Sequence, residues 1–179
     1  RLYASPLNDI DKALEYADRA RRLAPSNVET AGARGLVALA QGEFRYAHSL
    51  LRDAADKNPA FRLAFAQAAY GRGRSDDARQ EMQKLAELES ASPGQLAAAK
   101  SFLELTNPQA DPSTLRPKVE TRLAEAPNDL AARLVGAKLS EPEAATKTLE
   151  AILDQKPEFV PAQKALAALY LRDPSKYAG

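Results

Sequence analysis

Few residues in this chain have the types and spacing that chemistry requires. His48 is the only histidine and there is no cysteine. The sequence therefore lacks the donors for a histidine or thiolate metal site, a cysteine nucleophile or a self-contained catalytic triad. His48 follows Ala47 in a helical pattern, and we predict a structural or solvent-facing role for it near the surface. We predict no catalytic residue, no metal site and no cofactor.

Two pairs of carboxylates resemble the acid and base of a hydrolase. They are Asp76 with Asp77, and Glu141 with Glu143. Each pair opens a predicted helix, where negative charge stabilises the positive N-terminal end. This structural role accounts for both pairs, so the chain is predicted not to be an enzyme.

The segment Gly71-Arg72-Gly73-Arg74 superficially resembles a phosphate-binding loop. Such a loop needs a Lys and a Ser or Thr in fixed register after a strand, and neither is present here. We assign the two glycines to a turn between helices. A weak anion contact through Arg72 and Arg74 stays open as the alternative.

Composition narrows the class of partner. The 25 Lys and Arg residues nearly balance the 24 Asp and Glu residues, for a net charge of +1. This balance gives no bulk electrostatic reason to bind nucleic acid or an anionic membrane. No apolar run approaches the length of a membrane span, so membrane insertion is not expected. The apolar residues are dominated by Ala, which suits closely packed helix pairs.

Prolines divide the chain at a regular interval. Pro25, Pro59, Pro93, Pro127 and Pro161 are spaced 34 residues apart. A fixed period of this size indicates an array of helical repeats, with proline ending each one. We predict an all-α fold of ten or eleven helices. The predicted repeats of this single array are residues 1–25 (partial), 26–59, 60–93, 94–127, 128–157 and 158–179 (partial), excised from a longer protein.

Several local signals place the helix ends. Gly42 divides the 28–59 segment into two helices, and Ala47, Leu51 and Ala54 share one face of the second. Asp9 or Asp11 is predicted to cap the first helix of the chain.

Later in the chain, Gly71 and Gly73 end a helix and Ser75 caps the next. Pro117 is predicted to lie in the first turn of a helix that starts near Arg116. Pro157 ends the fifth repeat, so Pro161 falls in the first turn of a final helix over 160–172.

The 28–59 segment, VETAGARGLVALAQGEFRYAHSLLRDAADKNP, resembles a tetratricopeptide repeat, a helix–turn–helix unit of 34 residues. The match is carried by Gly35, Gly42, Phe44, Ala47, Ala54 and Pro59. The family's Trp is absent, and Arg34 and Ala38 replace its usual Leu and Tyr. The resemblance implies an α-solenoid of antiparallel helix pairs stacked in a right-handed superhelix.

Gly35 marks the predicted point of closest approach within this helix pair. Gly35→Leu is expected to overpack the contact and cost about 1–3 kcal/mol. Gly35→Ala is expected to stabilise slightly, because Gly is a poor helix former.

The resemblance also implies a concave groove lined by the first helix of each repeat. Its predicted partner-binding residues are Leu36, Leu39, Leu63, Tyr70, Lys100, Glu104, Leu134, Lys138 and Lys164. Family members that bind chaperone tails use a clamp of Lys, Asn and Arg. The equivalent positions here hold Gly32, Leu36, Ala66 and Tyr70, so chaperone-tail binding is not expected.

The predicted function is a non-enzymatic scaffold that binds a peptide, helix or protein surface. The alternative is a substrate-docking or regulatory segment of a larger enzyme or of an envelope or secretion assembly. Similarity to divergent, Ala- and Arg-rich repeat proteins implies a bacterial source, with the cytoplasm and the periplasm both open. Leu166, Leu169 and Tyr170 on the final helix are expected to leave an apolar surface through which copies self-associate.

Overall fold

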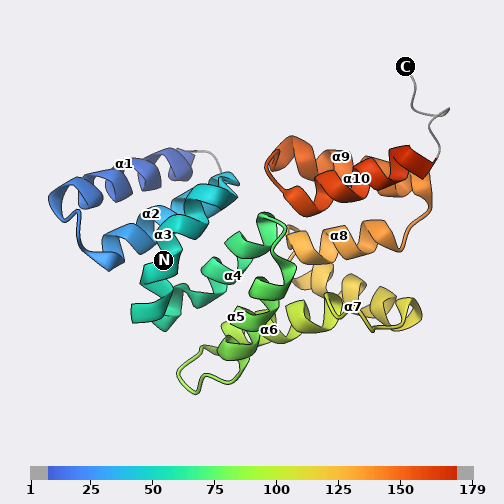
Figure 1. Cartoon of the computed structure of the whole chain (residues 1–179), viewed down its shortest axis with the longest axis horizontal. Helices are drawn as coiled ribbons and strands as arrows, with labels where there is room; N and C mark the ends of the chain where they lie inside the picture. Colours follow the sequence, from blue (N-terminus) through green and yellow to red (C-terminus); the bar gives the residue numbers. More distant parts are fainter. Residues whose placement is uncertain (1–7, 173–179) are drawn as a thin grey trace. The chain divides into compact units, whose positions relative to one another are not determined.

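The computed structural model describes residues 8–172, and every regular element among them is helical. The chain divides into two compact units, an N-terminal unit up to Ala91 and a C-terminal unit from Ser92. The helices of the N-terminal unit are α1 (Asn8–Leu23), α2 (Val28–Gln41), α3 (Phe44–Lys57), the short 3₁₀ helix η1 (Pro59–Phe61), α4 (Arg62–Gly71) and α5 (Ser75–Ala86). Those of the C-terminal unit are α6 (Pro93–Leu105), α7 (Pro112–Glu125), α8 (Leu130–Lys138), α9 (Pro142–Gln155) and α10 (Val160–Arg172) (Figure 1). The predicted all-α class is confirmed for this part of the chain.

The turn at Gly42 forms as predicted. Gly42 ends α2 in the left-handed region, at φ 85°, and its amide donates to the carbonyls of Ala38 and Leu39. Glu43 then donates its amide to Ala38 at 2.9 Å. These bonds satisfy carbonyls at the helix end that would otherwise lack partners. The chain reverses within two residues, which sets α3 beside α2.

Small residues let α2 and α3 pack closely. Ala47, Leu51 and Ala54 are all fully buried, which confirms the predicted inner face of α3. A Cβ built on Gly35 would lie 2.7 Å from Leu51 Cγ. Leu51 is fully buried and closely packed, so even the methyl group of an alanine at position 35 would push the Leu51 side chain, and with it α3, away from α2. The expectation that Gly35→Ala stabilises the protein is therefore corrected to a loss.

Two of the predicted helix caps are wrong. α1 begins at Asn8, so Asp9 and Asp11 lie inside it rather than at its cap. Ser75 is the first residue of α5, and Arg74 occupies the cap position without a side-chain cap bond. Arg74 instead forms an ion pair with Asp77 in the first turn. The predicted break before α5 does form, since Gly73 adopts a left-handed φ of 78°.

The start of α7 also differs from the prediction. Asp111 caps this helix by accepting the amide of Ser113, and Pro112 takes the first helical position. Pro117 therefore lies inside α7 instead of in its first turn. The helix tolerates it because only the carbonyl of Ser113, near the exposed N-terminal end, loses its helical partner.

The C-terminal unit buries its own core. Leu105, Leu115, Val119, Ala132 and Val135 form a buried cluster contributed by α6, α7 and α8. The predicted bounds of the final helix, 160–172, match α10. The outer ends of the two predicted partial repeats, residues 1–7 and 173–179, lie outside the described residues.

Candidate functional site

The predicted groove residues of the N-terminal unit differ in exposure. Leu36 on α2 is 43% exposed, while Leu39 and Leu63 are half-buried. Tyr70 is only 6% exposed, so the prediction that it lies on an open surface is wrong. α4 packs against α2, α3 and α5, so it buries residues around most of its circumference.

In the C-terminal unit, one predicted groove residue is buried and the other four are exposed. Lys100, Glu104, Lys138 and Lys164 are exposed, as a binding surface requires. Leu134 is 1% exposed and belongs to the core. Its helix, α8, contacts α6, α7, α9 and α10, which leaves little of α8 free.

His48 is buried rather than surface-facing as predicted. Its side chain packs against Phe65, with ring centroids 4.8 Å apart. Arg72 Nη1 lies 3.0 Å from His48 Nδ1. Because arginine only donates, Nδ1 accepts, and the neutral ring carries its proton on Nε2. Burial, assisted by the charges of Arg72, Arg74 and Arg52 and opposed by Asp77, lowers the pKa of His48 to about 4. The neutral ring therefore has a structural role in joining α3 to the α4–α5 turn.

This lowered pKa predicts acid sensitivity. The unfolded chain protonates His48 near its ordinary pKa of 6.5, and the folded protein only near 4. The stability that neutral His48 contributes is thus complete above about pH 6.5 and is lost as the pH falls through about 4. We expect a loss of about 1–2 kcal/mol after discounting for solvent screening.

Denaturant unfolding between pH 7.5 and pH 4 measures this loss, with His48→Gln as the reference because Gln also accepts a bond from Arg72. The wild type should lose more stability than His48→Gln over this interval. Parallel curves for the two proteins would contradict the assignment.

Both acidic pairs lie at the N-terminal ends of helices, as predicted. Asp76 and Asp77 are in the first turn of α5. Glu141 is at the cap position of α9 and Glu143 is in its first turn. Across residues 8–172, no group of three or more His, Asp or Glu side chains is arranged to hold a metal ion.

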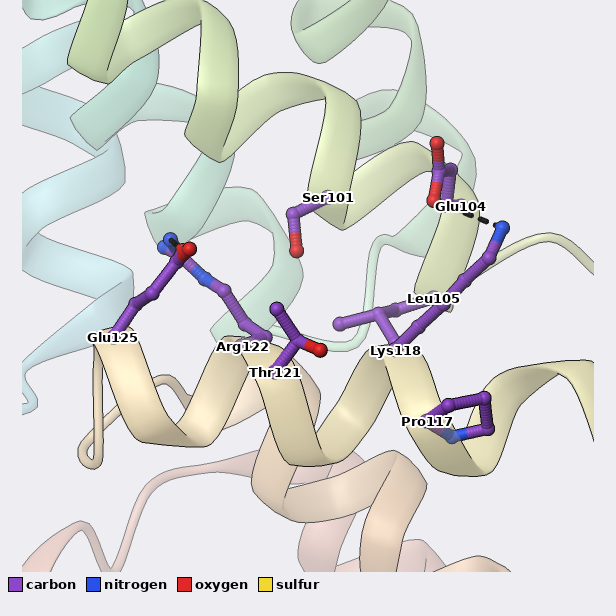
Figure 2. Close-up of a pocket in the computed structure, with 8 residues that line it drawn as sticks. All are labelled: Ser101, Glu104, Leu105, Pro117, Lys118, Thr121, Arg122 and Glu125. Atoms are coloured by element: carbon purple, nitrogen blue, oxygen red, sulfur yellow. Dashed lines mark ion pairs between the residues drawn. The ribbon is translucent and has the colours of Figure 1, made fainter.

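An open cleft lies between α6 and α7, with a volume of about 320 Å³ (Figure 2). α6 contributes Ser101, Glu104 and Leu105, and α7 contributes Pro117, Lys118, Thr121, Arg122 and Glu125. α7 turns Leu115 and Val119 toward the core cluster it forms with α8 and with Leu105 of α6. The lining residues of α7 lie on another face, and most are polar, so the two helices do not close over the cleft.

Ion pairs occupy both ends of this cleft. Lys118 pairs with Glu104 at 2.9 Å across it. Arg122 pairs with Asp129 at 2.8 Å and lies 3.9 Å from Glu125. Figure 2 shows Ser101, Thr121 and Leu105 between these ends. Charged and hydroxyl side chains line most of the cleft, and Leu105, which also lines it, is only 3% exposed.

Of the predicted groove residues, only Glu104 lines the cleft. The α7 wall was missed, although a signal for it exists in the sequence. Lys118, Thr121, Arg122 and Glu125 recur at helical spacing and make one continuous polar face. The predicted helix starting near Arg116 contains all four residues, but α7 is the second helix of its repeat, and the groove was predicted on the first helices only.

Comparisons with protein families and with curated proteins find no match to this chain. In the part of the chain that the structure describes, no helix is both long and apolar enough to cross a bilayer.

Proposed function

We propose that this chain is a non-enzymatic scaffold for protein–protein interaction, built as a tetratricopeptide-like α-solenoid. In this proposal its helix pairs stack in a right-handed superhelix, and the exposed faces of the first helices hold a peptide, a helix or a protein surface. A bacterial source and either the cytoplasm or the periplasm fit this proposal.

One observation carries the proposal. The second helix of three different pairs buries the same pattern, with residues four and then three positions apart. These residues are Ala47, Leu51 and Ala54 on α3, Ala78, Met82 and Leu85 on α5, and Ala145, Leu149 and Ile152 on α9. Repeated burial of one helical face is typical of units that cannot cover that face alone and must stack.

The exposed part of the predicted groove supplies the partner surface in this proposal. Leu36 provides an apolar contact in the N-terminal unit. Lys100, Lys138 and Lys164 provide charged contacts in the C-terminal unit. Self-association through Leu166, Leu169 and Tyr170 of α10 stays a separate prediction. These three side chains are half-buried, whereas the neighbouring Leu171 is 79% exposed.

Affinity capture followed by direct binding of the purified partner tests the scaffold. Leu36→Glu should lower the partner's affinity about tenfold or more, because it places a charge in an apolar contact. Leu23→Glu is the matched control, since Leu23 is 80% exposed on α1, outside the predicted groove. Circular dichroism should show both variants folded. Equal affinity of Leu36→Glu and Leu23→Glu for the partner would overturn the assigned surface, and the absence of any saturable partner would overturn the scaffold.

A further inference from the structure

We propose that Arg72, with Arg52 and Arg74 beside it, forms a binding site for a phosphate group on the N-terminal unit. The site lies where the turn between α4 and α5 meets α3 at His48. The sequence left an anion contact through Arg72 and Arg74 open, and the structure adds Arg52 and the packing around His48. The proposal does not depend on the scaffold function or on the predicted groove.

Arg72 is a partly buried cation with no carboxylate within ion-pair distance among residues 8–172. It occupies the C-terminal cap position of α4, and its Nη1 lies 3.0 Å from Nδ1 of His48. The neutral imidazole takes one N–H of the guanidinium and compensates none of its charge. A charge that is partly removed from water and unpaired favours an anion beside it. The remaining N–H groups of Arg72 can donate to such an anion.

Two more guanidinium groups lie near the same ring. Besides burial, the charges of three arginines lower the pKa of His48, in the order Arg72, Arg74 and Arg52. The carboxylate that opposes them is Asp77. Arg52 comes from α3 and Arg74 from the turn before α5, so cations from two different elements converge on the place where Arg72 meets α3.

The carboxylates beside these arginines leave the site open. Asp77 pairs with Arg74, and Asp53 pairs with Arg52 at 3.2 Å. The exposed fractions of these four side chains run from 46% to 71%. Exposed ion pairs are weak, so Arg52 and Arg74 can turn toward an incoming anion at little cost. Two carboxylates balance two of the three arginines, which leaves one positive charge, at Arg72.

The turn selects contacts from side chains with a tetrahedral anion. The amides of Arg72, Gly73 and Arg74 all donate to carbonyls of α4, so they are not free to cradle a ligand as the amides of a phosphate-binding loop do. Recognition therefore depends on guanidinium groups, whose planar pairs of N–H groups match the oxygens of phosphate. A phosphate group carries nearly two charges and three acceptor oxygens, so it can contact more than one of these arginines at once. A carboxylate has one charge and two oxygens.

NMR spectroscopy of the full chain tests this inference, because His48 is the only histidine and its imidazole signals report on the site. At pH 7.5 and constant ionic strength, these signals should shift saturably as inorganic phosphate is added. Acetate should need a concentration on the order of tenfold higher. A short peptide with one phosphoserine distinguishes two sources of the phosphate group. Tighter binding of the peptide assigns the site to a phosphorylated ligand, and tighter binding of inorganic phosphate assigns it to the free anion.

Substitutions of single arginines locate the binding. Arg72→Gln should weaken phosphate binding on the order of tenfold, and it should fold because glutamine can still donate to His48. Arg74→Gln, at an exposed position, should weaken binding by a smaller factor. Arg22→Gln is the matched control, since it removes the same charge from an exposed position on α1 and should leave binding unchanged.

A bound anion should also change the titration of His48. An anion held by Arg72 offsets the positive charge beside the ring, so it should raise the pKa of His48 from about 4 toward its ordinary value. Sulfate is the probe for this measurement, because it keeps its double charge at low pH. The inference is overturned if phosphate and sulfate leave the His48 signals unchanged at millimolar concentration, or if acetate binds as tightly as phosphate. Equal weakening by Arg22→Gln and Arg72→Gln would overturn it as well.

Discussion

Gly71→Ala should destabilise the N-terminal unit by about 1–3 kcal/mol, although a single methyl group is added. Gly71 is the last residue of α4, and the Phe44 ring occupies the space that a side chain at this position would need. A Cβ there would lie 2.1 Å from Phe44 Cδ1 and 2.3 Å from Cγ. Phe44 is 2% exposed, so its ring has no space into which it can move. The gain in helix propensity, at most about 1 kcal/mol, does not offset this overpacking.

Gly94→Ala is the matched control for this effect. Gly94 lies in the first turn of α6, and a Cβ there meets nothing within 4 Å. The substitution changes only the intrinsic helix propensity at this position, so the variant should be as stable as the wild type or slightly more stable. Thermal melts followed by circular dichroism should show Gly71→Ala lower by about 2–4 °C for each kcal/mol lost. Equal melting temperatures for the two variants would contradict the packing of Phe44 on Gly71.

Arg62→Ala should cost about 2–4 kcal/mol by leaving a buried carboxylate with one cation fewer. Arg62 Nη1 donates to Glu81 Oε2 at 2.5 Å, and the two side chains are only 16% and 12% exposed. Lys84 also reaches Glu81, at 2.7 Å, but its side chain is 51% exposed. Lys84 therefore retains part of the interaction, which keeps the cost below that of isolating the charge completely.

Replacing both partners of the ion pair separates two contributions to the cost of Arg62→Ala: the buried charge left on Glu81 and the packing lost with the Arg62 side chain. Arg62→Met with Glu81→Leu removes both charges and keeps most of the volume, so it should recover most of the stability lost in Arg62→Ala. Arg52→Ala is the control, because the Arg52–Asp53 pair is 65% and 71% exposed and should contribute little. Urea unfolding gives the free energies of all four proteins. A cost for Arg62→Ala no greater than that for Arg52→Ala would refute a stabilising role for the buried pair.

The sequence by itself determined the all-α class and the inner face of α3. Ala47, Leu51 and Ala54 were predicted to be buried because their spacing puts them on one side of a helix, whatever lies beyond it. The turn at Gly42 and the bounds of α10 were equally predictable. Each depends on signals within a few residues: a glycine that adopts a left-handed conformation, or a proline at the first turn.

Tertiary structure alone decided which of the remaining faces stay open. Tyr70 and Leu134 occupy positions predicted to face a groove, yet each lies on a short helix enclosed by several others. His48 is buried because Phe65 and Arg72, distant in sequence, close over it. The α6–α7 cleft exists because α7 turns Leu115 and Val119 toward α8 and leaves its polar face opposite α6. Helical periodicity encodes which residues share a face, but burial depends on how many neighbouring helices surround that face, and no local pattern records that number.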